Sequence, residues 1–166
     1  VLRFSVAGVP KPYVEISRAK FEDLASRHAK ASPLAGECLR SRVLCLLLRY
    51  HCLGAHGYQA ALPPAGFDVL REHLGCAFEC FASPLNAHHE AFCSCFGDAD
   101  VDSFFGSRGS FFDFRPSSGS FEANPPFVPE VMLAAVDHAE ALLMAADRTD
   151  QTEKTRSGGG GGGGGR

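Results

Sequence analysis

The sequence predicts an α/β protein in three parts: a helical segment over residues 1–75, part of a doubly wound, Rossmann-like core over 76–146, and a disordered tail over 147–166. Three observations support this division. Apolar residues recur at helical spacing three times before Gly75. Short apolar runs bounded by turn residues then follow, as is typical of buried strands. Residues 158–165 are an uninterrupted glycine run, which cannot form a core or a stable element.

Three helices are expected in the first part. The first covers residues 16–30, where Phe21 and Leu24 fall at helical spacing. The second covers 36–53 and carries so many large apolar side chains that it should be largely buried. The third begins at Pro63-Pro64 and ends at Gly75, because proline favours the first helical position and glycine the position after the last turn.

The second part should hold three short strands. Residues 76–81 are apolar and rich in aromatic side chains, and they lie between a helix-ending glycine and a Ser-Pro turn. Further strands are expected at Phe111 and at Ser120, and a last helix over 130–146. Residues 82–86 form the loop at the carboxyl end of the first strand. Doubly wound folds bind their ligands at this edge of the sheet.

The tetrapeptide Asn124-Pro125-Pro126-Phe127 follows the last expected strand and is typical of enzymes that methylate an exocyclic amino nitrogen. That nitrogen is a poor nucleophile in adenine, because its lone pair is conjugated into the ring. The side-chain oxygen of Asn124 and the carbonyl of Pro125 can each accept one of its N–H groups. The prolines stiffen the loop, and Phe127 offers a flat face to an unstacked base. The alternative is a proline-rich strand exit before a helix that begins at Pro129.

Four runs resemble, in order and spacing, the phosphorylated-CTD-interacting factor family. They cover residues 76–86, 105–109, 113–114 and 118–127. Members of this family are the cap-specific mRNA adenosine N6-methyltransferases. The resemblance implies methylation of N6 on the 2'-O-methyladenosine next to the cap of mRNA, in the nucleus, with S-adenosylmethionine as cofactor.

The resemblance also implies site residues. The catalytic set is Asn124, Pro125, Pro126 and Phe127. The cofactor set is Glu79, Ala82, Ser83, Pro84, Leu85, Asn86 and Asn124. Substrate contacts are expected at Phe127, Arg108 and Glu130. Family members usually have an acidic residue two places after the tetrapeptide, where this chain has Pro129, with Glu130 one place later. Glu122, like Glu79, is a carboxylate inside an apolar strand and needs either a partner or an end position. Either carboxylate can hold the amino group or the ribose of the cofactor, and the alternative is that both are structural.

Two other functions stay open. The chain can be a non-catalytic remnant or interaction domain whose parent binds RNA or the phosphorylated tail of RNA polymerase II. It can also belong to an enzyme that methylates amino groups in DNA or protein, since other families share the tetrapeptide. The sequence has no Trp, so the paired-tryptophan module through which the family binds that tail is expected to lie outside it. With three strands where a doubly wound enzyme has about six, we expect a partial chain that is inactive in isolation.

Composition favours a folded intracellular chain. Hydrophobic residues make up 45% of it, and the formal net charge of -3 argues against an extensive nucleic-acid-binding face. The seven Cys are an odd number, and no signal peptide or long apolar run is present, so neither disulfides nor a membrane segment is expected. Cys38, Cys45 and Cys52 share one helical face and should pack as small hydrophobic residues.

No metal site is expected. Residues 88–95 contain two His and two Cys, but they lack the spaced pairs of ordinary zinc sites. The aspartates within 98–102 imitate the start of a calcium loop, yet Ser103 stands where its sharp turn needs glycine. A solvated acidic loop over 97–109 is the simpler interpretation.

Overall fold

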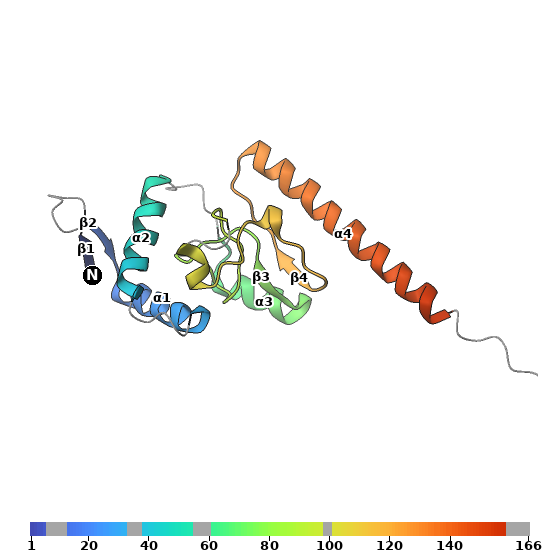
Figure 1. Ribbon diagram of the computed structural model, residues 1–166, viewed down its shortest axis with the longest axis horizontal. Helices are drawn as coiled ribbons and strands as arrows, with labels where there is room; N and C mark the ends of the chain where they lie inside the picture. The colour runs from blue at the N-terminus through green and yellow to red at the C-terminus, as the bar shows by residue number, and fades with distance from the viewer. Residues whose placement is uncertain (6–12, 33–37, 55–60, 98–100, 159–166) are drawn as a thin grey trace, which may run out of the picture.

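The structure is a computed structural model that describes residues 1–5, 13–32, 38–54, 61–97 and 101–158 (Figure 1). The chain opens with an antiparallel hairpin, β1 (Leu2–Ser5) against β2 (Tyr13–Ile16), in which Leu2 lies opposite Ile16. The prediction of a purely helical segment over 1–75 is therefore wrong at its start. Apolar and polar residues alternate along both short runs, and this alternation favours strands.

Helices α1 (Arg18–Ala31), α2 (Leu39–Cys52) and α3 (Pro64–Leu74) follow, so the three predicted helices are confirmed. The hydroxyl of Ser17 accepts a hydrogen bond from the backbone N–H of Lys20 and caps α1. Gly75 ends α3 in the left-handed conformation, with φ of 63°. The start predicted for the second helix, Gly36, lies outside the described residues.

Helix α2 is buried along one face only. Val43 and Leu46 are fully enclosed and pack in a core with Leu24 of α1, together with Ile16 and Phe105. The cysteines Cys38, Cys45 and Cys52 are exposed, which corrects the prediction that they are core residues. They do share one face of the helix, but this face points away from the side that Val43 and Leu46 bury.

A small parallel sheet lies in the second half of the chain. Strand β3 (Cys76–Glu79) pairs in parallel with β4 (Ser120–Glu122), with Glu79 opposite Glu122. On the other side of β3, Phe92 forms parallel bridges with Glu79 and with Ser107. Four segments thus run side by side in one direction: β4, β3 and the residues at Phe92 and Ser107. The strands of a doubly wound sheet are arranged in this way, but there helices connect them, whereas here not every connection contains a helix. The fold is mixed α/β, and the described residues do not include a complete doubly wound sheet.

The strand predicted at Phe111 is instead a short 3-10 helix, η3 (Phe111–Asp113). The hydroxyl of Ser110 accepts a hydrogen bond from the N–H of Phe112, which begins the helical turn that the aromatic run alone does not indicate. The predicted loop over 97–109 contains a second 3-10 helix, η2 (Val101–Phe105). Asp102 in it has no exposed surface, so this part of the loop is not a solvated acidic segment. Residues 98–100 lie outside the described part.

The last helix, α4 (Pro129–Gly158), continues well past the predicted end at residue 146. Its polar second half includes Gln, Glu, Lys and Arg, which are good helix formers, so the loss of apolar periodicity does not end the helix. Residues 147–158 are therefore helical, and only 159–166 of the expected tail lie outside the described residues. The helix extends away from the remainder of the molecule (Figure 1). None of the described helices combines the length and apolar character needed to cross a membrane.

Helix α4 contacts the body through few side chains. Ala135 is buried and Leu142 half-buried, and both pack on a cluster that includes Cys80, Cys93 and Phe111. Ala146, further along the helix, is exposed. His138 is half-buried against Phe111, with ring centroids 4.7 Å apart.

Candidate functional site

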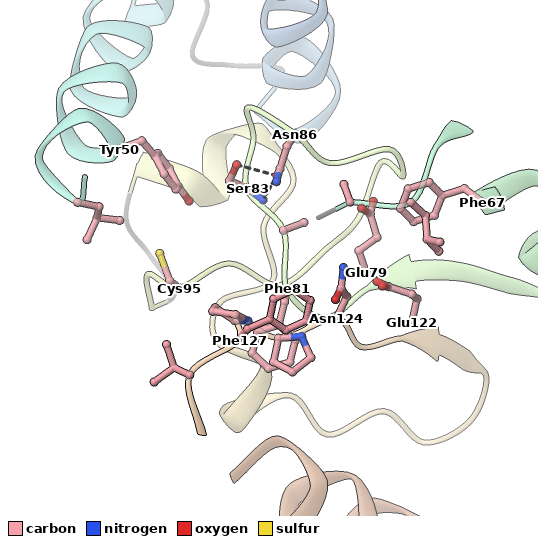
Figure 2. Close-up of a pocket in the computed structure, with 17 residues that line it drawn as sticks. Tyr50, Phe67, Glu79, Phe81, Ser83, Asn86, Cys95, Glu122, Asn124 and Phe127 are labelled. Carbon is pink, nitrogen blue, oxygen red and sulfur yellow. Dashed lines mark hydrogen bonds between the residues drawn. The ribbon is translucent and has the colours of Figure 1, made fainter. Parts of the chain in front are cut away.

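The carboxyl ends of β3 and β4 open into a hollow of about 330 Å³ (Figure 2). The end of α2 and the start of α3 close its other sides. Eight residues predicted for the site line it: Glu79, Ala82, Ser83, Asn86, Asn124, Pro125, Pro126 and Phe127. This is the edge of a parallel sheet at which ligands are expected to bind.

Four predicted site residues lie elsewhere. Pro84 is fully buried, and Leu85 packs against the core between α1 and α2. Arg108 lines a separate hollow beside α1. Glu130 is exposed at the start of α4.

The loop after β3 is held in a tight turn by two of its own side chains. The Asn86 side-chain oxygen accepts hydrogen bonds from the N–H of Ser83 at 2.7 Å and from its hydroxyl at 2.8 Å (Figure 2). The Asn86 N–H donates in turn to the Ser83 carbonyl at 3.1 Å. Asn86 therefore acts as a brace that sets the shape of the loop.

Two carboxyl groups lie at the floor of the hollow. The buried Glu79 is fixed by the N–H groups of His88 and His89, which donate to the same oxygen, Oε1, at 2.8 Å and 2.7 Å. Glu122 lies opposite Glu79 in the sheet register and is half-buried. Burial, and next the negative charge of Glu79, raise the pKa of Glu122. Two neighbouring carboxyls thus have different environments.

The Asn124–Phe127 loop forms the wall beside these carboxyls. Asn124 and Pro125 are half-buried, whereas Phe127 is 60% exposed although it lines the hollow. The N–H of Val128 donates to the Pro126 carbonyl at 2.7 Å, so the chain turns tightly before α4 begins. A large aromatic face is thereby left accessible at the mouth of the hollow.

Sequence reasoning did not identify several lining residues. Tyr50, Phe67, Phe81 and Cys95 also border the hollow. They come from α2, α3 and two loops, and no local motif marks them. Only the tertiary packing brings them to one place, so a single sequence carries no signal for their role.

Tyr50 is held by a buried carboxylate. Its hydroxyl donates to Asp102 at 2.5 Å, and Arg49 forms an ion pair with the other Asp102 oxygen at 3.3 Å. Burial raises the pKa of Asp102, although both hydrogen bonds oppose that effect. The ring of Tyr50 also meets Phe96 edge-on at 5.5 Å. These contacts fix the end of α2 as one wall of the hollow.

An aromatic stack borders the floor from α3. The Phe67 ring lies parallel to that of His88 at 4.7 Å and edge-on to that of His89 at 5.4 Å. His89 is buried, and its Nε2 has no hydrogen-bond partner among the described residues. Burial is the main cause that lowers the pKa of His89. The described part of the chain contains no group of three His, Cys, Asp or Glu side chains that is arranged to hold a metal ion.

These features define a mixed α/β protein with a hollow at the carboxyl edge of a parallel sheet, which is the edge where doubly wound proteins bind their ligands. A family model described as "Phosphorylated CTD interacting factor 1 WW domain" matches residues 20–153. The chain belongs to this family, which confirms the resemblance seen in the sequence. The description mentions a WW domain, but this sequence contains no Trp.

Two curated relatives carry the name mRNA (2'-O-methyladenosine-N(6)-)-methyltransferase, one from Mus musculus and one from Homo sapiens. Each is 46% identical to this chain over 138 residues, which are 78% of the chain. The same region is only 19% of each relative, so the chain spans about a fifth of their length. Membership in a family of methyltransferases follows from these comparisons.

Proposed function

We propose that this chain supplies the cofactor site and the target-amine site of an S-adenosylmethionine-dependent adenosine N6-methyltransferase that acts on capped mRNA. One observation carries the proposal: the 82–86 loop and the Asn124–Phe127 loop, far apart in sequence, line the same hollow. The names of the relatives supply the reaction and the substrate class. A nuclear location accompanies this substrate and is part of the proposal.

The residues of the hollow fit such a cofactor. Carboxyl groups of Glu79 and Glu122 face a space in which a cationic group would be favoured. Aromatic and small side chains form the remaining walls and suit a flat base or ribose. S-adenosylmethionine, when bound, supplies an electrophilic methyl group attached to a sulfonium sulfur.

The chain's own residues would hold and orient the amine. The side-chain oxygen of Asn124 and the carbonyl oxygen of Pro125 accept its two N–H groups, which draws the nitrogen towards a tetrahedral shape and frees its lone pair. Phe127 stacks on the base and holds it at the mouth of the hollow. The stiff Pro-Pro backbone keeps both acceptors in place, so the rate gain comes from positioning and fixed dipoles.

The cofactor site is tested by equilibrium dialysis of the purified chain with radiolabelled S-adenosylmethionine. We expect saturable binding that weakens more than about tenfold in Asn86→Ala, because the brace of the 82–86 loop is lost. Leu143→Ala, which alters an exposed side chain of α4, is the matched control and should bind normally. A chain that fails to bind the cofactor, or an Asn86→Ala variant that binds it as tightly as the unaltered chain, would contradict the proposal.

The same samples test transfer. Capped RNA that begins with 2'-O-methyladenosine is the acceptor, and RNA that begins with 2'-O-methylinosine, which lacks the exocyclic amine, is the control. Any methyl transfer that the unaltered chain catalyses should be absent with the inosine RNA. It should also be absent when the Asn124→Ala variant is assayed with the adenosine RNA. The assay also decides the sequence-based prediction that this chain alone is inactive.

A second candidate function is recognition of the phosphorylated tail of RNA polymerase II, and it is favoured by the family's description. The absence of Trp and the net charge of -3 argue against it, because phosphopeptide sites usually rely on clustered basic side chains. Fluorescence anisotropy with phosphorylated and unphosphorylated tail peptides separates the two functions. A preference for the phosphorylated peptide would favour this second function.

A further inference from the structure

The two carboxyls at the floor of the hollow are not equivalent. Glu79 receives two backbone N–H groups, which hold its carboxylate in place. No described residue donates a hydrogen bond to the Glu122 carboxyl or forms an ion pair with it. This group lines the hollow beside Glu79 and Asn124 (Figure 2). A half-buried carboxyl next to a fixed carboxylate lacks a positively charged partner. Two neighbouring carboxyl groups do not both ionise easily, because their negative charges repel each other.

None of the described groups around Glu122 forms an ion pair with it. Besides Glu79, the ionisable residues that border the hollow or contact this pair are Tyr50, Cys80, His88, His89 and Cys95. Burial raises the pKa of Tyr50, Cys80 and Cys95 and lowers that of His89, so these four are neutral near pH 7. The His88 ring is stacked on Phe67, and Arg71 on α3 is ion-paired with Asp68 at 2.9 Å. Among the described residues no cation compensates Glu122, which favours a ligand as the source of the positive charge.

We propose that Glu122 is a specificity-determining residue that selects a cationic sulfonium cofactor over its neutral thioether product. The inference rests on the proposed function and deepens it. No covalent bond changes in this step, because the Glu122 carboxylate forms an ion pair with the sulfonium cation when the cofactor binds.

The position of Glu122 along the chain supports a role close to the sulfur. Glu122 ends β4, and Asn124, two residues later, lines the same hollow and is proposed to hold the acceptor amine. A methyl donor must bring its sulfur within a few ångströms of that amine, so the positive charge lies close to Glu122. After transfer the sulfur is neutral and this attraction is lost. Glu122 would thus favour exchange of product for fresh cofactor.

Isothermal titration calorimetry of the full chain tests this proposal. S-adenosylmethionine and S-adenosylhomocysteine are each titrated into the unaltered chain and into Glu122→Gln, so that the ratio of the two dissociation constants is measured for both proteins. We expect the unaltered chain to bind the cationic ligand more tightly than the neutral one. In Glu122→Gln this preference should fall about tenfold, or about 1.4 kcal/mol.

Glu140→Gln removes an exposed carboxyl on α4 and is the matched control for net charge. It should behave as the unaltered chain does. Circular dichroism checks that Glu122→Gln folds, which we expect because the amide has the same shape. An unaltered chain with no preference for S-adenosylmethionine, or a preference that persists in Glu122→Gln, overturns the inference alone. Failure of both ligands to bind overturns the proposed function and the inference with it.

Discussion

Gly106 allows a close approach between two loops. Its φ is 105°, and a Cβ at this position would collide with the backbone carbonyl oxygen of Glu90. The adjoining Ser107 continues the parallel array, since it pairs with Phe92. The glycine thus lets the chain turn tightly enough to add the outermost segment of the sheet.

Gly106→Ala should therefore destabilise the protein by more than the strain of a positive φ alone would cause. We expect a loss of about 2 kcal/mol or more in the free energy of unfolding, measured with urea. Gly119→Ala is the matched control, because Gly119 has a similar φ of 110° but open space around it. Equal losses in the two variants would show that the close contact with Glu90 is unimportant.

Short local motifs allowed the sequence to indicate residues that meet in the hollow. The Asn124–Phe127 tetrapeptide and the residues Ser83 and Asn86 line it, although their proposed roles stay predictions. The sequence-based expectation was wrong for Asp102, whose burial depends on Tyr50 and Arg49 from a distant helix. A carboxylate in an acidic run looks solvated until its partners are known.

At the scale of elements, α4 rests on the body through a narrow contact. Ala135 and Leu142 pack on the aromatic and cysteine cluster, and His138 meets Phe111. The next residue, Leu143, is 66% exposed. The stability of the attachment should therefore depend on very few side chains.

Adjacent leucines give a direct test of this contact. Leu142→Ala should lower the free energy of unfolding by about 1 to 2 kcal/mol, because a half-buried apolar contact is lost. Leu143→Ala should change it by less than about 0.5 kcal/mol. Urea unfolding followed by circular dichroism measures both. Similar losses in the two variants would mean that α4 turns a different face to the body.

The elements that were predicted correctly carry their signals within their own residues. Apolar periodicity marks α1 to α3, and Gly75 and the Pro63-Pro64 pair mark their ends. The hairpin of β1 and β2 was missed because each strand has only four residues. Phe111 was assigned to a strand because aromatic residues favour strands, whereas the Ser110 cap and tertiary packing favour the 3-10 turn.

At the scale of the whole molecule, buried ionisable groups make stability depend on pH in two opposing ways. Burial lowers the pKa of His28 and His89 from 6.5. Their contribution to the free energy of unfolding is therefore complete above pH 6.5 and is lost as pH falls below that value. Burial raises the pKa of Asp102 and Glu122. Their contribution to the free energy of unfolding is therefore complete below the pKa values that these groups have in the unfolded chain, and it is lost as pH rises. The contribution of these four groups to the melting temperature should therefore pass through a minimum between the carboxyl range and the histidine range.

His89→Phe isolates one of these groups. Phenylalanine can keep the edge-on contact with Phe67 and removes the buried nitrogen, so the decrease in melting temperature between pH 7.5 and pH 5.5 should become smaller. His73→Phe alters an exposed histidine and should leave the decrease unchanged. An unaltered pH dependence in His89→Phe would contradict a neutral buried imidazole at this position. Differential scanning fluorimetry in a series of buffers gives the comparison.

The parallel pairing of β3 with β4 also has a consequence for biosynthesis. The two strands are joined through a long intervening stretch, so their contact closes a large loop and is expected to form slowly. Because the chain is made from its amino terminus, the 82–86 loop leaves the ribosome well before Asn124. The hollow therefore cannot exist on a nascent chain until β4 has emerged, and both halves of the site should be completed in one late step.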